Sequence, residues 1–463
     1  MSDILLTHGY FLWEDEKEQQ IMKPYPTLGL LYNAAWLKRA GFDVALYDAT
    51  FGNRPELYAK LASMCAPVLG LYTNLITRGT IVQIVAEAKK HGWHVVVGGP
   101  ESANYPAEYL AHGADVIVVG EGEATLAELL PALKTHGPHR LHAVAGIVFR
   151  DETGRMVRTP ERDQIADIDS IPWPARELID QQQYVDIWRK HHGMGSVNLI
   201  TARGCPYKCK WCSHAVFGYS HRRRNFMDCA DEVQYIAETY KPDQVWYADD
   251  VFTISHRWLY DYAAELKRRN LKLPFETISR ADRMMDDRVL ATLAEMGCYR
   301  IWIGSESGSQ RILDAMQRGV TVEQVQWATK AAQKHGIEVG MFLMWGYDGE
   351  DLSDIEATID HVKKANPNIF FTTVSYPIKN TPYYNKIENS LALNTSWAAS
   401  TDRDYVIKGR HTRAYYKHAD KWLRNEVAAF RLHESDPTQA ATHQQAAEQA
   451  KQDLLKTAHE VEQ

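Results

Sequence analysis

Three cysteines stand close together in this chain, in the stretch ARGCPYKCKWCSH at positions 202–214. Cys205, Cys209 and Cys212 are separated by three and then two residues, although the chain has only six cysteines in all. Thiolates clustered at such short spacing are first of all metal ligands, because they bind zinc and the iron of iron–sulfur clusters. We therefore predict a metal site on these three side chains.

The spacing by itself leaves two kinds of metal centre open. A structural zinc site needs four ligands, and the fourth would be His214, His221 or Cys229. An iron–sulfur cluster on three cysteines instead leaves one iron without a protein ligand and open to a small molecule. The three-plus-two spacing favours this second reading. We expect the remaining cysteines, Cys65, Cys229 and Cys298, to be structural.

The cysteines follow a predicted strand, VNLITARG, which opens a series of strands and helices from residue 198 onward. Six strand-helix units are too few for the usual eight-stranded barrel, so we predict a partial (β/α)6 barrel. Its active site should lie at the carboxyl ends of the strands, where the cysteines stand. The further strand candidates are DQVWYADDVF, FETISRAD, YRIWIGSES, EVGMFLMWG and IFFTTVSYP.

The first half of the chain also alternates strands with helices. Its strands, such as DVALYDA, APVLGLYT and HVVVGGP, are apolar throughout and are separated by amphipathic helices. This pattern is typical of a parallel sheet with helices on both faces, so the fold class is α/β with an N-terminal doubly wound sheet. We predict four regions: an α/β domain over 1–145, a linker with a hairpin over 146–197, the partial barrel over 198–395, and a helical C-terminal region over 396–463.

The cysteine stretch resembles the signature of the radical S-adenosylmethionine superfamily. That signature is Cys-x3-Cys-x-aromatic-Cys after the first strand of a partial barrel, and it stands here as CPYKCKWC. The resemblance implies a 4Fe–4S cluster held by Cys205, Cys209 and Cys212, with S-adenosylmethionine chelating the open iron. Reduction by one electron would then give a 5′-deoxyadenosyl radical, which the protein places against one C–H bond of its substrate.

Later strand ends resemble the same superfamily in the expected order. YADDVF at 247–252 resembles its second-strand acidic pair, Asp249 and Asp250. SRAD at 279–282 implies that Arg280 pairs with the methionyl carboxylate, a role that suits a bidentate guanidinium. IGSESGS at 303–309 implies that Ser305 and Glu306 contact the amino acid or the ribose.

The N-terminal half resembles a cobalamin-binding domain, and the whole chain resembles the cobalamin-binding radical S-adenosylmethionine subfamily. No G-x-G-x-x-G follows the first strand, which argues against a dinucleotide fold. GEGE at 120–123 often closes such domains, whereas the cobalt-ligating motif Asp-x-His-x-x-Gly is absent, since His8 and Gly9 are adjacent. We expect cobalamin without a histidine ligand. The resemblance implies contacts from TNL and GGP, that is Thr73, Asn74, Leu75, Gly98, Gly99 and Pro100.

The amino-acid composition excludes several classes of protein. The chain has 463 residues, 45% hydrophobic and 24% charged, which suits a globular protein of more than one domain. The net charge of −7 gives nucleic-acid binding no support. A run of about 18 apolar residues is absent, so we expect no membrane span, and no signal-peptide pattern opens the chain, so we expect a cytoplasmic protein.

Three functions remain. The first is C-methylation of an unactivated carbon in a small-molecule substrate, and the second is oxidative cyclisation or rearrangement of a porphyrin-like or other metabolite after the same radical start. Either would need a reductant such as flavodoxin or ferredoxin. The third is a zinc-stabilised binding protein. The basic run HRRRN at 221–225 is either a patch for an anionic substrate or electron donor, or an exposed turn.

Overall fold

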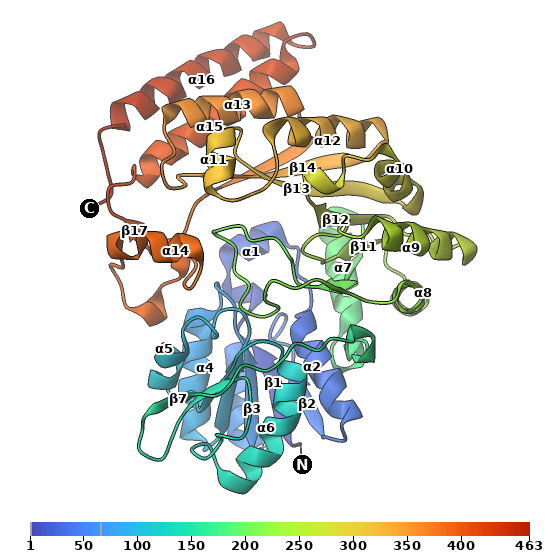
Figure 1. Ribbon diagram of the computed structural model, residues 1–463, viewed down its shortest axis with the longest axis vertical. Helices are drawn as coiled ribbons and strands as arrows, with labels where there is room; N and C mark the ends of the chain where they lie inside the picture. Colours follow the sequence, from blue (N-terminus) through green and yellow to red (C-terminus); the bar gives the residue numbers. More distant parts are fainter. Residues whose placement is uncertain (1, 65–66) are drawn as a thin grey trace. The chain divides into compact units, whose positions relative to one another are not determined.

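The computed structural model describes residues 2–64 and 67–463 and shows an α/β protein built on two sheets with parallel strands (Figure 1). The chain divides into two compact units. The first unit comprises Met1–Pro206, Ser213–Trp246 and Thr395–Asp402, and the second comprises Tyr207–Cys212, Tyr247–Asn394 and Arg403–Gln463. The division therefore passes through the cysteine stretch.

The first unit is built on a seven-stranded sheet in the order β2-β1-β3-β4-β5-β6-β7. The first five strands in this order pair in parallel, as the sequence predicts, and β6 and β7 add an antiparallel hairpin. This hairpin lies in the stretch predicted as a linker, so the sheet continues into it. The strands are β1 (Ile4–His8), β2 (Val44–Tyr47), β3 (Val68–Tyr72), β4 (His94–Gly98), β5 (Val116–Val118), β6 (Ile147–Arg150) and β7 (Met156–Arg158).

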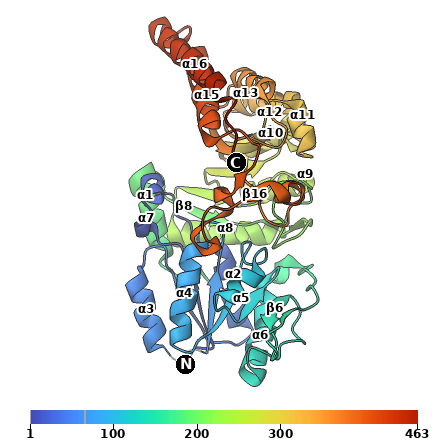
Figure 2. The same ribbon diagram turned by 90° about the vertical axis from the view of Figure 1, so that its left-hand side faces the viewer.

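Helices cover both faces of this sheet because its strands are apolar on both sides. In β1, Leu5 packs into one buried cluster, whereas its neighbours Ile4 and Leu6 pack into the other. The first cluster includes residues of α3 and α4, which lie side by side in Figure 2, and the second includes residues of α2 and α6. The helices of this unit are α1 (Glu16–Ile21), α2 (Leu28–Arg39), α3 (Arg54–Ser63), α4 (Arg78–Lys90), α5 (Pro106–Ala111), α6 (Gly122–His136), α7 (Gln181–His192) and α8 (Phe226–Tyr240).

The second sheet has six strands in the order β15-β14-β13-β12-β11-β8. Strands that are neighbours in this sheet are also successive along the chain, apart from β9 and β10, which form a separate pair. The pairs β12–β13, β13–β14 and β14–β15 are parallel, and each needs the helical crossover that the sequence predicts. Its strands are β8 (Ser196–Leu199), β11 (Gln244–Tyr247), β12 (Phe275–Ser279), β13 (Cys298–Glu306), β14 (Glu338–Trp345) and β15 (Ile369–Val374). The crossover helices are α9 (His256–Arg268), α10 (Asp287–Met296), α11 (Gln310–Ala315), α12 (Val322–Lys334) and α13 (Leu352–Ala365).

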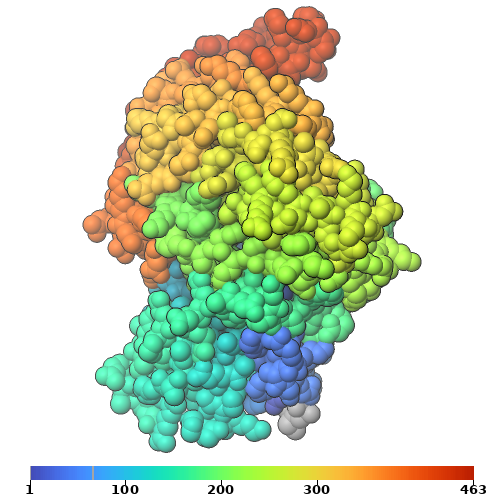
Figure 3. Space-filling model, turned by 45° about the vertical axis from the view of Figure 1, so that its right-hand side comes forward, coloured from blue at the N-terminus to red at the C-terminus, as the bar shows by residue number. Residues whose placement is uncertain are grey.

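The C-terminal part of the second unit is helical. After α14 (Pro382–Ile387) and a short pair of strands, β16 (Leu391–Ala392) and β17 (Val406–Ile407), two long helices follow. These helices, α15 (Arg413–Leu432) and α16 (Pro437–Thr457), pack along each other, and α15 also packs against α13. The red C-terminal residues project from the surface of this unit in Figure 3.

The structure departs from the predicted elements at particular points. The strand expected to run into the cysteines ends at Leu199, because the next extended residues leave this sheet: β9 (Ala202–Arg203) pairs with β10 (Arg222–Arg223) instead. The helices α1 and α3 were not predicted, since α1 buries no residue and α3 buries only Leu57 and Leu61.

Two of the three remaining cysteines lie within the described residues. Cys229 and Cys298 are buried, as expected of structural residues, and burial raises the pKa of the Cys298 thiol. Cys65 lies outside the described residues. No helix within the described ranges is long and apolar enough to cross a membrane.

Candidate active site

The three cysteines differ in their surroundings. Cys205 is half-buried and belongs to the first unit, whereas Cys209 is buried and Cys212 is exposed, and both belong to the second. Among the residues that the structure describes, no three His, Cys, Asp or Glu side chains are grouped as metal ligands. The metal site on these cysteines stays a prediction, and the contacts of Cys209 show whether its surroundings fit one.

Cys209 lies against two arginines. Its Sγ atom is 3.7 Å from Nη1 of Arg318 and 4.0 Å from Nη1 of Arg280, and all three side chains are buried. Guanidinium groups stabilise negative charge in a buried place, and an iron–sulfur cluster with thiolate ligands carries negative charge. The surroundings of Cys209 therefore fit a thiolate ligand of such a cluster.

Glu306 lies beside the same arginine in an unusual backbone conformation. Its Oε1 is 3.9 Å from Nε of Arg318, and its φ of +66° is left-handed, at the point where β13 shifts its register against β14. A Cβ atom on Gly304 would lie 2.6 Å from that Oε1, so the glycine makes room for the carboxylate. Burial raises the pKa of Glu306, although Arg318 and Arg280 oppose it. Strained non-glycine residues of this kind concentrate at functional sites.

The guanidinium of Arg280 is held by several groups of the second unit. Its Nε donates to Asp282 at 2.9 Å, its Nη2 donates to the carbonyl of Arg318 at 2.8 Å, and its Cζ lies 3.5 Å from the ring centroid of Tyr207. These contacts fix the group next to Cys209. Its predicted pairing with a methionyl carboxylate stays a prediction.

The other residues predicted to bind S-adenosylmethionine lie at strand ends, as expected. Ser305 is buried, and its hydroxyl is 2.9 Å from Nε2 of His361 on α13, so that hydroxyl already has a partner within the second unit. Asp249 is buried in the loop that follows β11. The structure therefore brings Arg280 and Glu306 together with Cys209, and it gives Ser305 a different partner.

In the first unit, the carboxyl ends of three parallel strands meet where cobalamin contacts are predicted. His8 of β1 lies opposite Tyr72 of β3, which lies opposite Gly98 of β4. Ligands of open α/β sheets bind at this edge. Leu75 and Pro100 are partly exposed there, and their contact with cobalamin stays a prediction.

The polar and glycine residues at this edge also serve the loops themselves. The hydroxyl of Thr73 is buried and lies 3.1 Å from Oη of Tyr109, and the side chain of Asn74 accepts from the backbone N–H of Ile76. Gly99 has a φ of +111°, and a Cβ there would lie 2.3 Å from the carbonyl oxygen of Thr73. A glycine at this position therefore lets the loops after β3 and β4 touch, which is a different reason from the ligand approach predicted for the glycine pair.

His8 stands near the position where related domains ligate cobalt, but both of its ring nitrogens have partners. Nδ1 accepts from the backbone N–H of Tyr10 at 3.2 Å, so the proton is on Nε2, which lies 3.1 Å from Oδ1 of Asp48. Tyr184 donates to the second oxygen of that carboxylate at 2.7 Å. This arrangement fits the expected absence of a histidine ligand.

A buried ion cluster joins three segments of the first unit. Arg78, which follows the TNLIT segment, is 2.6 Å from Glu101 and 2.6 Å from Asp402. Glu101 follows GGP directly, and Asp402 belongs to the segment of Trp397, whose ring centroid is 4.9 Å from Cζ of Arg78. Burial raises the pKa of Glu101 to about 7, since Arg78 does not offset the desolvation and the nearby Asp402 carboxylate adds to it. Both predicted cobalamin segments are thus tied to residues 395–402.

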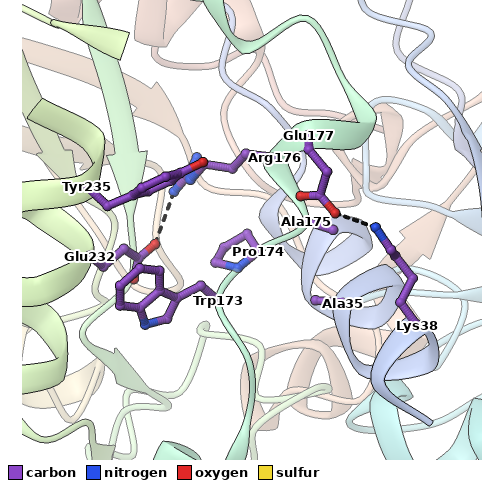
Figure 4. A pocket seen from close by; sticks show the side chains of 9 residues that line it. All are labelled: Ala35, Lys38, Trp173, Pro174, Ala175, Arg176, Glu177, Glu232 and Tyr235. Carbon is purple, nitrogen blue, oxygen red and sulfur yellow. Dashed lines mark hydrogen bonds and ion pairs between the residues drawn. The ribbon is translucent and has the colours of Figure 1, made fainter. Parts of the chain in front are cut away.

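A shallow pocket of about 270 Å³ also opens in the first unit, between α2, α8 and residues 173–177 (Figure 4). Arg176 and Glu232 are buried beside it and paired at 3.4 Å, and Trp173 and Tyr235 form an aromatic wall. None of the residues predicted from the sequence lines it. Since its buried charges are paired with each other, we assign it no chemistry.

Comparison with known proteins gives two family matches. The model of the radical SAM superfamily matches residues 199–362, and that of the B12 binding domain matches residues 21–130. The chain combines a B12 binding domain with a radical SAM domain. Both resemblances seen in the sequence are confirmed. A radical SAM domain works with a 4Fe–4S cluster and S-adenosylmethionine, and a B12 binding domain binds cobalamin, so the three predicted cofactors follow.

Individual relatives agree with this assignment. An uncharacterized methyltransferase of Pyrococcus horikoshii is 28% identical over 88% of this chain and 88% of its own length. An anaerobic magnesium-protoporphyrin IX monomethyl ester cyclase of Rubrivivax gelatinosus is 25% identical over 76% of this chain and 64% of its own length. The structure of the methyltransferase TsrM from Kitasatospora setae, with cobalamin and a [4Fe-4S] cluster bound, has a TM-score of 0.70 and 19% identity and covers 86% of this chain and 78% of its own. That likeness supports the α/β fold with parallel sheets.

Sequence reasoning missed Arg318 and Arg78. Arg318 stands in MQRGV, a turn that carries no motif, and Arg78 is the first residue of an ordinary amphipathic helix. Only the fold brings these arginines to Cys209 and to Glu101. No spacing rule in the sequence could have identified them.

Proposed function

We propose that this enzyme transfers a methyl group to an unactivated carbon of a small-molecule substrate. The observation that carries the proposal is the presence of a B12 binding domain and a radical SAM domain in one chain. The relative matched over 88% of the chain, which is named as a methyltransferase, supports it. Cobalamin can carry a methyl group, and a radical allows its transfer to a carbon that is neither acidic nor nucleophilic.

Within this proposal, Cys205, Cys209 and Cys212 hold the cluster. When bound, the cofactors supply a 5′-deoxyadenosyl radical and a methyl group. Arg280 and Arg318 place positive charge beside Cys209. The remaining predicted contacts are Asp249, Arg280, Ser305 and Glu306 for S-adenosylmethionine, and Thr73, Asn74, Leu75, Gly98, Gly99 and Pro100 for cobalamin.

We also propose the finer architecture. The first sheet is a doubly wound sheet of the cobalamin-binding type, and the second is a partial (β/α)6 barrel followed by a helical C-terminal region. The strand order β15 to β8, with helices between successive strands, supports the barrel. A reductant such as flavodoxin or ferredoxin delivers the electron.

Oxidative cyclisation of a porphyrin-like metabolite is the second candidate. The similarity to a cyclase over 76% of the chain favours it, although the share of that relative's length that is matched is smaller. The mass of the product separates the two functions. Methylation adds one CH2 unit, whereas cyclisation adds oxygen or removes hydrogen.

The test is anaerobic turnover of the reconstituted enzyme with cobalamin, S-adenosylmethionine labelled with deuterium in its methyl group, a reductant and a panel of candidate substrates. We expect 5′-deoxyadenosine together with a product that carries the labelled methyl group. A Cys209→Ala variant should form neither compound. Formation of 5′-deoxyadenosine with every candidate, and labelled product with none, would count against methyl transfer.

A further inference from the structure

The loop that carries the cysteines closes on itself. This cysteine loop, residues 204–221, begins after β9 and ends before β10, and these two short strands pair with Arg203 opposite Arg222. Its first residue, Gly204, has a φ of +83°, and a Cβ there would lie 2.4 Å from the carbonyl oxygen of Ser220. Both ends of the loop therefore meet at one place in the first unit.

Two carboxylates hold these ends. Arg203 donates from Nη1 to Glu121 at 2.8 Å and from Nη2 to Glu123 at 2.5 Å, while Arg222 donates from Nη1 to the second oxygen of Glu121 at 2.8 Å. The side chains of both glutamates and of Arg203 are at most 6% exposed, and that of Arg222 is 11% exposed. Glu121 thus bridges the residue before the loop and the residue after it.

The carboxylates stand on a rigid part of the first unit. Glu121 is the residue before α6 and Glu123 lies in the first turn of that helix, which follows β5 after a short loop. The second oxygen of Glu121 also accepts from the backbone N–H of Ile165 at 2.8 Å, and Arg222 donates to the carbonyl of Ile165 at 2.7 Å. The ring of Phe217, inside the loop, lies 5.5 Å from the guanidinium of Arg203.

Two arginines of the basic run HRRRN, Arg222 and Arg224, are paired with carboxylates inside the first unit. Arg222 takes part in the network above, Arg223 donates to Thr201, and Arg224 is paired with Asp228 and Glu232. The carboxylate partners neutralise Arg222 and Arg224, so these two side chains form neither a free basic patch nor an exposed turn.

Stability alone is a poor explanation for such a network. Moving four charges out of water has a large desolvation cost, and apolar side chains of similar volume are often as stable. What directed ion pairs provide is one fixed geometry, because a planar guanidinium donates its hydrogen bonds in fixed directions. The ends of the cysteine loop are the parts that this network fixes.

We propose that Glu121 and Glu123 of the GEGE segment are positioning residues that hold the cysteine loop in the geometry its cluster requires. This inference rests on the proposed function, because it assumes that the loop carries a cluster. It gives the GEGE segment, which lies in the matched B12 binding domain, a role toward the iron site.

The first measurement uses the full chain without metal. Trypsin can cleave the cysteine loop after Lys208 or Lys210, and cleavage reports how often the loop opens. Glu121→Gln removes the negative charge that pairs with both arginines. We expect this variant to raise the cleavage rate in the loop about tenfold. Arg203→Lys, which keeps the charge but loses the fork, should fall between the wild type and Arg203→Gln.

The second measurement uses anaerobically reconstituted protein. We expect Glu121→Gln to retain about a tenth of the wild-type iron and sulfide per chain, and its reduced cluster to show a broadened electron paramagnetic resonance signal with S-adenosylmethionine. The matched control is Glu101→Gln, which removes an equally buried glutamate partner of an arginine in the same unit. It should keep the wild-type loop cleavage, iron content and spectrum.

The outcomes separate this inference from the proposed function. A wild type that takes up no iron–sulfur cluster contradicts the proposed function, while the trypsin result still tests the anchor. If Glu121→Gln matches the wild type in both cleavage and cluster, the positioning role is wrong. It is equally wrong if Glu101→Gln loses the cluster to the same extent, since the loss would then reflect general destabilisation.

Discussion

At the scale of single residues, what matters is which donor atoms are still available to a cofactor. His8 has none, since Nδ1 accepts from Tyr10 and Nε2 faces Asp48. We predict that bound cob(II)alamin gives an electron paramagnetic resonance spectrum without nitrogen splitting from a histidine, and that His8→Ala gives the same spectrum. Nitrogen splitting that is present in the wild type and lost in His8→Ala would overturn this prediction.

The same scale shows what could be predicted from the sequence about the site. The spacing of the cysteines identifies them in the sequence, and the position of Arg280 in SRAD after a strand identifies that arginine. Arg318 does not, because it lies 109 positions from Cys209 in the chain and reaches it only through the path of β13 and α11. Local spacing carries motifs, whereas contacts between distant turns depend on the tertiary fold.

At the scale of elements, the glycine turn after β14 makes a clear prediction. Gly346 and Gly349 both have left-handed backbone, but a Cβ on Gly346 would lie 2.7 Å from Cζ of Tyr416 on α15, whereas the nearest atom to a Cβ on Gly349 is 3.8 Å away. Gly349→Ala adds strain of about 1 kcal/mol, and Gly346→Ala adds overpacking of about 1–3 kcal/mol more. Urea denaturation of the two variants measures the difference, and equal losses would mean that Tyr416 moves aside freely.

The ion cluster of Arg78 makes a second prediction at this scale, for pH. Because the pKa of Glu101 is raised from 4.5 to about 7 in the folded protein, its contribution to stability is fully present below about pH 4.5 and is lost as the pH rises through about 7. We predict that, relative to Glu101→Gln, the free energy of unfolding of the wild type falls by on the order of 1–3 kcal/mol between about pH 5 and 8. Urea denaturation of both proteins across this range is the measurement, and parallel pH curves would exclude the raised pKa.

The sequence predicts a helix or strand well where its residues are buried along the whole element, and less well where they are not. Strands such as β3 and β4 are buried apolar runs, and the sequence predicts their ends to within a few residues. The strand predicted before the cysteines is too long, because Ala202 and Arg203, near its end, pair with a segment beyond the loop. A strand that changes its partner leaves no break in an apolar pattern.

At the scale of the whole molecule, the two domains each bring their own cofactor, and the chain has to load both. The residues predicted to contact cobalamin lie on loops of the first sheet, whereas the arginines beside Cys209 lie in the second unit. Since the two sets of residues are different, loss of one cofactor should leave the other in place.

We predict that Gly99→Ala loses cobalt and keeps iron, and that Cys205→Ala loses iron and keeps cobalt. An added Cβ on Gly99 would lie 2.3 Å from the carbonyl oxygen of Thr73, which forces apart the loops after β3 and β4, and we expect at least about tenfold weaker cobalamin binding, or about 1.4 kcal/mol. Gly137→Ala is the matched control, because its backbone is also left-handed but nothing lies within 4 Å of the added atom. Iron, sulfide and cobalt are measured in the same anaerobic samples. If folded Gly99→Ala loses both metals while Gly137→Ala keeps both, the two cofactors load together, and the separate assignment of their binding residues fails.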